Sequence, residues 1–178
     1  MDELPAYQAT LLGAAYAGIG RLPVGILLDN VRSLYNVGSF FRTADAVRAE
    51  RLYLSGITPT PSDPRIAKTA LGAEASIGWE KSADALATVN QLRARGYELV
   101  AIETSLQAVD LFDWQPSFPV CVVFGHEVDG ISKPVLDRCD VHVRIPTLGL
   151  KQSINVATAG GVVLYELLRK YRHLLVQA

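Results

Sequence analysis

The apolar residues of this chain fall into short, nearly continuous runs, separated by segments in which they recur every three or four positions. Short continuous runs are typical of parallel strands that are buried on both faces. Five runs predict strands, at Val24–Leu28, Arg51–Ser55, Tyr97–Ile102, Val120–Phe124 and Val141–Ile145. The spacing between them predicts helices at Asn36–Val47, Arg65–Leu71, Ser82–Arg95 and from Ser153 to about Tyr171.

Local signals support these helix assignments. Asp63 can cap the second helix and Pro64 suits its first position, while Gly96 follows the third helix as a C-terminal stop. Strands that alternate with helices predict an α/β fold, with a mostly parallel sheet and helices on both faces. We expect one domain over residues 1–178. Residues 1–23 form a short N-terminal extension in which Tyr7–Ala17 reads as one helix.

The last helix carries two apolar stripes, one through Val156, Gly160 and Val163 and the other through Gly161 and Leu164. A helix that is apolar on two sides must be buried on two sides. The second surface is either another subunit or another part of the same domain, and the pattern alone leaves both open.

Composition narrows the class of protein. The chain has 178 residues, 49% of them hydrophobic and 20% charged, as in a core-rich globular domain. Its net charge of −1 gives no overall attraction for nucleic acid, so any RNA affinity must come from a local patch. No apolar run reaches the roughly 18 residues of a membrane span, and both cysteines sit near apolar runs as reduced thiols. We therefore expect a cytoplasmic protein.

Several common site types are missing from the sequence. There is no phosphate-binding loop, no dinucleotide glycine pattern and no nucleophile elbow. The histidines at 126, 142 and 173 are scattered and no C-x-x-C occurs, so we expect no metal site.

Polar chemistry instead gathers in three loops that follow predicted strands. They lie in Leu27–Arg42, Val120–Ser132 and Arg144–Val156, and are rich in Asn, Arg, Glu, Ser and Gly. Open α/β sheets bind nucleotide-like ligands outside the carboxyl ends of their strands. The pattern therefore predicts a ligand site built from these loops.

Within these loops, N-V-G-S-F-F-R (Asn36–Arg42), F-G-H-E-V-D-G-I (Phe124–Ile131) and I-P-T-L-G-L-K-Q-S-I-N-V (Ile145–Val156) resemble motifs 1, 2 and 3 of the SpoU/TrmH branch of the SPOUT methyltransferases. They occur in the family's order, and the resemblance spans about Val24 to Leu168. It implies a C-terminal deep trefoil knot, S-adenosylmethionine bound in the knot, a homodimer, and methyl transfer to a ribose 2′-hydroxyl of RNA.

The resemblance also assigns catalytic positions. Arg42 matches the motif 1 arginine, which is proposed in the family to handle the hydroxyl proton with the help of an RNA phosphate. Because arginine stays protonated near neutral pH, anchoring the phosphate and orienting the hydroxyl is the better role. Asn36 reads both as the cap of its helix and as a residue that positions the substrate or Arg42. Glu127 could hold either of these side chains or be a solvated loop acid. Ser153 reads as a helix cap beside the ligand, and Asn155 follows it at the start of the last helix.

The expected cofactor site combines backbone, apolar walls and one hydroxyl. Gly125 and Gly130 would let backbone approach the ligand closely or adopt positive φ, or simply make turns. The residues assigned to the cofactor are Thr104, Gly125, Gly130, Ile145, Leu148, Gly149, Ser153 and Ile154.

A basic patch on the same side would contact RNA, through Arg32, Arg65, Lys68 and Lys151. Stand-alone catalytic domains of this family more often act on tRNA, so tRNA is the preferred substrate and rRNA the alternative. Two other classes stay open: a non-catalytic RNA-binding module that keeps the knotted fold, and an S-adenosylmethionine enzyme acting on a small molecule.

Overall fold

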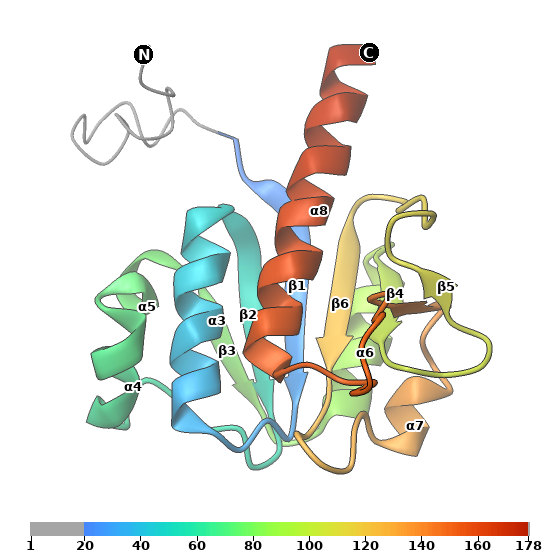
Figure 1. Cartoon of the computed structure of the whole chain (residues 1–178). Helices are drawn as coiled ribbons and strands as arrows, with labels where there is room; N and C mark the ends of the chain where they lie inside the picture. The colour runs from blue at the N-terminus through green and yellow to red at the C-terminus, as the bar shows by residue number, and fades with distance from the viewer. Residues whose placement is uncertain (1–19, 178) are drawn as a thin grey trace.

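A single parallel sheet of seven strands forms the centre of the computed structural model, which describes residues 20–177 (Figure 1). Its strands are β1 (Leu22–Asp29), β2 (Ala49–Ser55), β3 (Trp79–Ser82), β4 (Glu98–Ile102), β5 (Val109–Asp110), β6 (Val120–Phe124) and β7 (Val141–Arg144). Their order across the sheet is β3-β2-β1-β6-β4-β7-β5. The predicted helix Tyr7–Ala17 lies outside the described residues.

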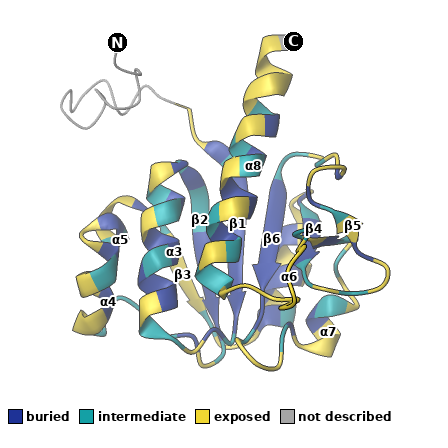
Figure 2. Ribbon diagram, in the orientation of Figure 1, coloured by how far each residue is buried: buried dark blue, intermediate teal, exposed yellow. Residues whose placement is uncertain are grey.

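Helices cover both faces of the sheet, as the alternation of elements predicted. They are α3 (Leu34–Ala46), α4 (Pro64–Ala70), α5 (Ala73–Ser76), α6 (Ala85–Ala94), α7 (Lys133–Leu136) and α8 (Val156–Gln177). Ile26 and Leu28 of β1 face the core that contains α3, α4, α5 and α8, whereas Leu27 faces the core formed with α6 and α7. The central strands β1 and β6 are therefore buried on both sides, which explains their continuous apolar sequences (Figure 2).

The predicted elements are present, with corrected ends. Helix α3 begins earlier than expected because Ser33, not Asn36, is its N-cap, and the Ser33 side chain accepts a hydrogen bond from the Asn36 N–H. Helix α6 begins at Ala85 after the Asp84 cap, since Ser82 belongs to β3. The caps predicted for α4, Asp63 and Pro64, are confirmed.

The last helix differs most from its prediction. Asn155 rather than Ser153 caps it: its Oδ1 accepts hydrogen bonds from the N–H groups of Ala157 and Thr158 at 2.9 and 3.2 Å. The helix then continues to Gln177, and its C-terminal turns project beyond the sheet (Figure 1). The sequence pattern missed β3, β5, α5 and α7, each only two to four residues long.

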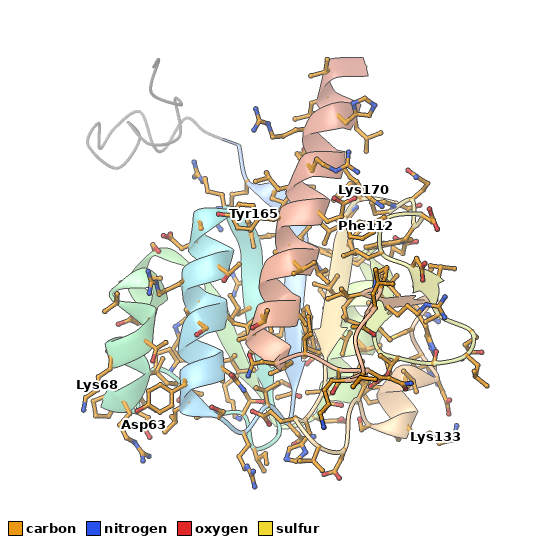
Figure 3. All side chains as sticks on the ribbon, viewed as in Figure 1. Asp63, Lys68, Phe112, Lys133, Tyr165 and Lys170 are labelled. Atoms are coloured by element: carbon orange, nitrogen blue, oxygen red, sulfur yellow. The ribbon has the colours of Figure 1, made fainter. Side chains whose placement is uncertain are left out.

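Helix α8 packs on α3 through a glycine contact. Gly160 faces Phe40 of α3, and Phe40 in turn meets Phe124 of β6 with ring centroids 5.0 Å apart. The buried Lys170 fastens α8 to the segment after β5 by donating hydrogen bonds to the carbonyls of Leu111 and Phe112 (Figure 3). The first apolar stripe of α8 therefore lies against this chain's own core.

We expect Gly160→Ala to lower the free energy of unfolding by about 1–3 kcal/mol, because its Cβ would lie 2.3 Å from Cε1 of Phe40. Gly161→Ala is the matched control. A Cβ there meets nothing within 4 Å in this chain, so helix propensity should raise stability by up to about 1 kcal/mol. Urea unfolding of both variants measures the difference. Equal losses would mean that a second surface also covers α8 at Gly161.

Candidate active site

Three loops from distant parts of the sequence meet in one hydrogen-bond network at the carboxyl ends of the strands. The Glu127 carboxylate, after β6, accepts hydrogen bonds from the N–H groups of Arg32 and Ser33 at 3.1 and 2.9 Å and from Nδ2 of Asn36 at 2.9 Å. Nδ2 of Asn155 donates to Oδ1 of Asn36 at 3.1 Å. Asn36 therefore links the loop after β6 to the start of α8.

The environment of Glu127 favours its charged form. Burial acts to raise the pKa of this carboxyl, but the hydrogen bonds from Arg32, Ser33 and Asn36 outweigh burial and leave the pKa below its ordinary value of 4.5. Glu127 is therefore ionised at neutral pH. Its negative charge orients the amide of Asn36, so that the Asn36 oxygen faces Asn155.

Beside this network lies a cavity of about 570 Å³ at the ends of β4, β6 and β7. Its lining combines backbone, hydroxyl, carboxylate and apolar groups: Ile102, Glu103, Thr104, Phe124, Gly125, His126, Glu127, Val128, Gly130, Arg144, Ile145, Thr147, Gln152, Ser153, Ile154, Asn155, Val156 and Ala159. Parallel α/β sheets bind their ligands at this edge.

Most of the residues assigned from the sequence come together here. Of the expected catalytic residues, Glu127, Ser153 and Asn155 line the cavity, and so do Thr104, Gly125, Gly130, Ile145 and Ile154 of the expected cofactor set. Gly130 has φ of +72°, which fits its predicted role in a left-handed turn.

Four of the residues assigned to catalysis or to the cofactor do not line the cavity. Asn36 is buried and is connected to the cavity by its hydrogen bonds with the lining residues Glu127 and Asn155. Leu148 is fully exposed, and a Cβ on Gly149 would meet nothing within 4 Å, so this part of the loop before α8 leaves the cavity wall. Arg42 is exposed on α3, six residues or about 9 Å along the helix axis from Asn36.

The four basic residues expected to bind RNA are all exposed, but they differ in which site they lie near and in whether they are paired. Arg32 and Lys151 are exposed on the loops that border the network and the cavity. Arg65 forms two hydrogen bonds with Asp63 at 2.9 and 2.6 Å, and this guanidinium holds the pKa of Asp63 at about 2. These bonds pair Arg65 with a carboxylate of its own chain. Lys68 is exposed on α4, beyond α3 as seen from α8 (Figure 3).

Sequence reasoning missed several residues of the cavity, above all Glu103, His126, Arg144 and Gln152. Glu103 directly follows β4, so its place at a strand end could have pointed to it, whereas the family resemblance selected only the next residue, Thr104. Arg144 is held by Asp110 of β5 at 2.6 Å, a contact that depends on a strand the pattern did not predict.

We expect Glu127→Gln to lower stability at pH 7 by about 1 kcal/mol, because one acceptor oxygen becomes an NH₂ group facing backbone donors. The pKa of Glu127 is depressed on folding, so this stabilisation is present above about pH 4.5 and is lost as the pH falls through the lower folded value. Urea unfolding at pH 7 and pH 3.5 checks both points. Glu80→Gln, an exposed carboxylate 3.9 Å from Arg51, should change little at either pH. A Glu127→Gln deficit as large at pH 3.5 as at pH 7 would contradict the charge argument.

Two kinds of feature are not found in the part of the chain that the structure describes. None of its helices is both long and apolar enough to cross a membrane. Among residues 20–177, no three His, Cys, Asp or Glu side chains are grouped so that they could hold a metal ion.

The parallel sheet and its strand-end cavity define an α/β protein of the kind that binds nucleotide-like cofactors. Residues 23–165 match the model of the SpoU rRNA methylase family, so the chain belongs to this family. The resemblance inferred from the three motifs is confirmed.

Individual relatives agree with this family. A Staphylococcus haemolyticus protein whose name places it among TrmH family tRNA/rRNA methyltransferases is 30% identical over 148 residues, which are 83% of this chain and 59% of the relative. The chain thus spans about three fifths of that relative's length.

Two solved structures show the same fold. The SpoU methyltransferase AviRb of Streptomyces viridochromogenes, in complex with AdoMet, has a TM-score of 0.79 and 27% identity, covering 89% of this chain and 64% of that one. A structure described for 2-OH methylation of C/U34 on tRNA has a TM-score of 0.75 and 25% identity, covering 84% and 97%.

Proposed function

We propose that this chain transfers a methyl group from S-adenosylmethionine to a ribose 2′-hydroxyl of RNA, with tRNA as the preferred substrate. The observation that carries the proposal is the network of Glu127, Asn36 and Asn155, which joins all three motifs at the edge of the cavity. Membership in the SpoU family and the AdoMet complex of AviRb support the reaction class and the cofactor. The tRNA-related neighbour, 97% of which this chain covers, favours tRNA over rRNA.

The residues of the cavity suit S-adenosylmethionine. Cavities that hold ligands of this size measure about 300–1,000 Å³, and this one measures about 570 Å³. The cofactor carries an adenine, a ribose, an amino acid group and a positive sulfonium. The cavity offers matching chemistry: apolar walls, hydroxyls and carboxylates, from Ile145, Ile154, Thr104, Ser153, Glu103 and Glu127.

S-adenosylmethionine would supply the methyl group, and the chain would prepare the RNA. Glu127 keeps the Asn36 amide oriented, and Asn155 keeps the start of α8 beside it. Ser153 lines the cavity, and because Asn155 caps α8 in its place, the Ser153 hydroxyl would serve the ligand. Arg42, which has no hydrogen-bond or ion-pair partner among the described residues, would anchor the phosphate next to the target ribose.

The knot and the homodimer belong to this proposal. The order β6-β4-β7 places the segment after β7 next to loops made earlier in the chain, and α8 then returns to the face where α3 lies. A threaded C-terminal segment is compatible with that path. For the homodimer, Val162 and Tyr165 leave an exposed apolar strip on the outer side of α8, 37% and 54% accessible. Sedimentation equilibrium of the protein would report the mass of the assembly.

The proposal is tested by incubating the protein with methyl-labelled S-adenosylmethionine and, separately, total tRNA and rRNA from the same cells. The labelled nucleotides are then mapped by digestion and mass spectrometry. We expect label on a ribose 2′-oxygen in the tRNA fraction. Cofactor binding without label in any RNA would instead identify a non-catalytic module, and label in rRNA alone would replace the substrate class.

A further inference from the structure

The cavity contains one carboxylate that motif reasoning did not assign, that of Glu103. It directly follows β4, the strand between β6 and β7, so it lies between the two loops that carry motifs 2 and 3. Among the described residues, no lysine, arginine or histidine forms an ion pair with it. A carboxylate that lines a cavity and forms no ion pair with a protein cation still has acceptor positions that a ligand can use.

The carboxylate is fixed in position by backbone. Oε1 accepts a hydrogen bond from the Thr104 N–H at 2.9 Å, and Oε2 accepts one from the Ile131 N–H at 3.4 Å. A carboxylate has about four acceptor positions, so these two bonds leave each oxygen able to accept one more. The anchoring N–H groups come from the loops after β4 and after β6, so the carboxylate is held from two sides while its two oxygens stay adjacent by their covalent geometry.

Gly130 makes room for this arrangement. It has φ of +72°, and a Cβ at this position would lie 2.6 Å from Oε2 of Glu103. Any other residue at position 130 would both strain the backbone and displace the carboxylate. The glycine of motif 2 therefore has a specific partner in this chain.

We propose that Glu103 binds the ribose diol of the nucleoside cofactor, an inference that rests on the function proposed above. Two vicinal hydroxyls are a rigid pair of donors, and the fixed carboxylate is a rigid pair of acceptors. A carboxylate at a strand end binds a ribose hydroxyl in the same way in other nucleotide-binding α/β sheets. A compact ammonium group would need only one of the two oxygens, so the paired geometry favours the diol.

The test measures how much each ribose hydroxyl contributes to binding affinity in the presence and in the absence of the Glu103 carboxylate. Calorimetric titration uses S-adenosylhomocysteine and its 2′-deoxy and 3′-deoxy analogues, against the wild type and Glu103→Gln. In the wild type, each missing hydroxyl should weaken binding about 10- to 100-fold, as expected for a hydrogen bond to a charged group. In Glu103→Gln, binding of the parent ligand should weaken by a similar factor. With this variant, the deoxy analogues should bind less than about 3-fold more weakly than the parent ligand does.

Controls separate this role from a structural one. Glu80→Gln, an exposed carboxylate on β3, should bind all ligands like the wild type. Gly130→Ala, which displaces the same carboxylate from the other side, should reproduce the reduced discrimination and provides a second variant if Glu103→Gln does not fold. 5′-Methylthioadenosine, which keeps the diol but has no amino acid group, should also bind Glu103→Gln more weakly.

Equal weakening of the parent and the deoxy ligands in Glu103→Gln would overturn the inference and make Glu103 a loop anchor. Unchanged affinity for 5′-methylthioadenosine would overturn it too, in favour of the ammonium group. A wild type that binds none of these nucleosides would contradict the proposed function itself, and the inference with it.

Discussion

Arg42→Ala should reduce kcat/KM for methyl transfer about 10²- to 10³-fold and leave S-adenosylmethionine affinity within several-fold of the wild type. The structure supports this separation because Arg42 lies on α3 outside the cavity, exposed and without a hydrogen bond that the fold needs. Its planar guanidinium can hold a phosphate bidentately beside the reacting ribose. Water that fills the space in the variant cannot reproduce this bidentate contact. Steady-state kinetics with the mapped RNA and calorimetric titration of the cofactor together measure the two effects.

Two further variants make the Arg42 result specific. Arg42→Lys keeps the charge but loses the bidentate geometry, so it should recover only part of the activity. Arg138→Ala removes the same charge just beyond α7, on the opposite face of the sheet, and should be nearly normal. If Arg42→Ala instead lost cofactor binding or stability, Arg42 would be a structural residue and its assigned role wrong.

Gly125→Ala should damage both the fold and the cofactor site. A Cβ on Gly125 would lie 2.1 Å from the carbonyl carbon of Gly130 and 2.2 Å from the Ile131 nitrogen, and both are backbone atoms. Moving them would break the paired hydrogen bonds between His126 and Gly130, at 2.9 and 3.0 Å. We expect a loss of about 1–3 kcal/mol in unfolding free energy. Activity should fall by about 10²-fold, since a displacement of about 1 Å disrupts the site to that extent.

Gly78→Ala is the matched control for Gly125→Ala. A Cβ there would meet only the Arg51 guanidinium, at 3.7 Å or beyond, an ordinary contact. Urea unfolding and titration with S-adenosylhomocysteine are to be run on both variants. A Gly125→Ala protein with wild-type stability and affinity would show that the loop after β6 can relax, and that close packing is not what the glycine provides.

A structural feature could be predicted from the sequence when neighbouring residues along the chain determine it. The strands Val24–Leu28 and Val120–Phe124 could be predicted because burial on both faces requires continuous apolar runs. The Asp63 cap and Pro64 of α4 were equally local. Helix starts were less reliable: Ser33, Asn36, Ser153 and Asn155 can all cap a helix, and only the observed backbone path distinguishes them.

The candidate site shows the same division. The three motifs, read from the sequence, assigned catalytic positions to Glu127, Asn36 and Asn155. Their geometry depends on contacts across 91 and 119 residues, which no local pattern contains. Glu103 was missed because a glutamate after a strand is also an ordinary loop residue until β4 is known to lie between β6 and β7.

The sequence by itself determined the class of fold and the family, and it selected part of the lining of the cavity, because burial and motif identity are properties of local segments. Only the tertiary structure decided which of those residues meet. It joined Asn36 to Glu127 and Asn155, turned Leu148 away from the cavity, and placed the Glu103 carboxylate beside Gly130. The physical reason is that the order of parallel strands across the sheet, and not their order in the chain, brings their carboxyl ends together.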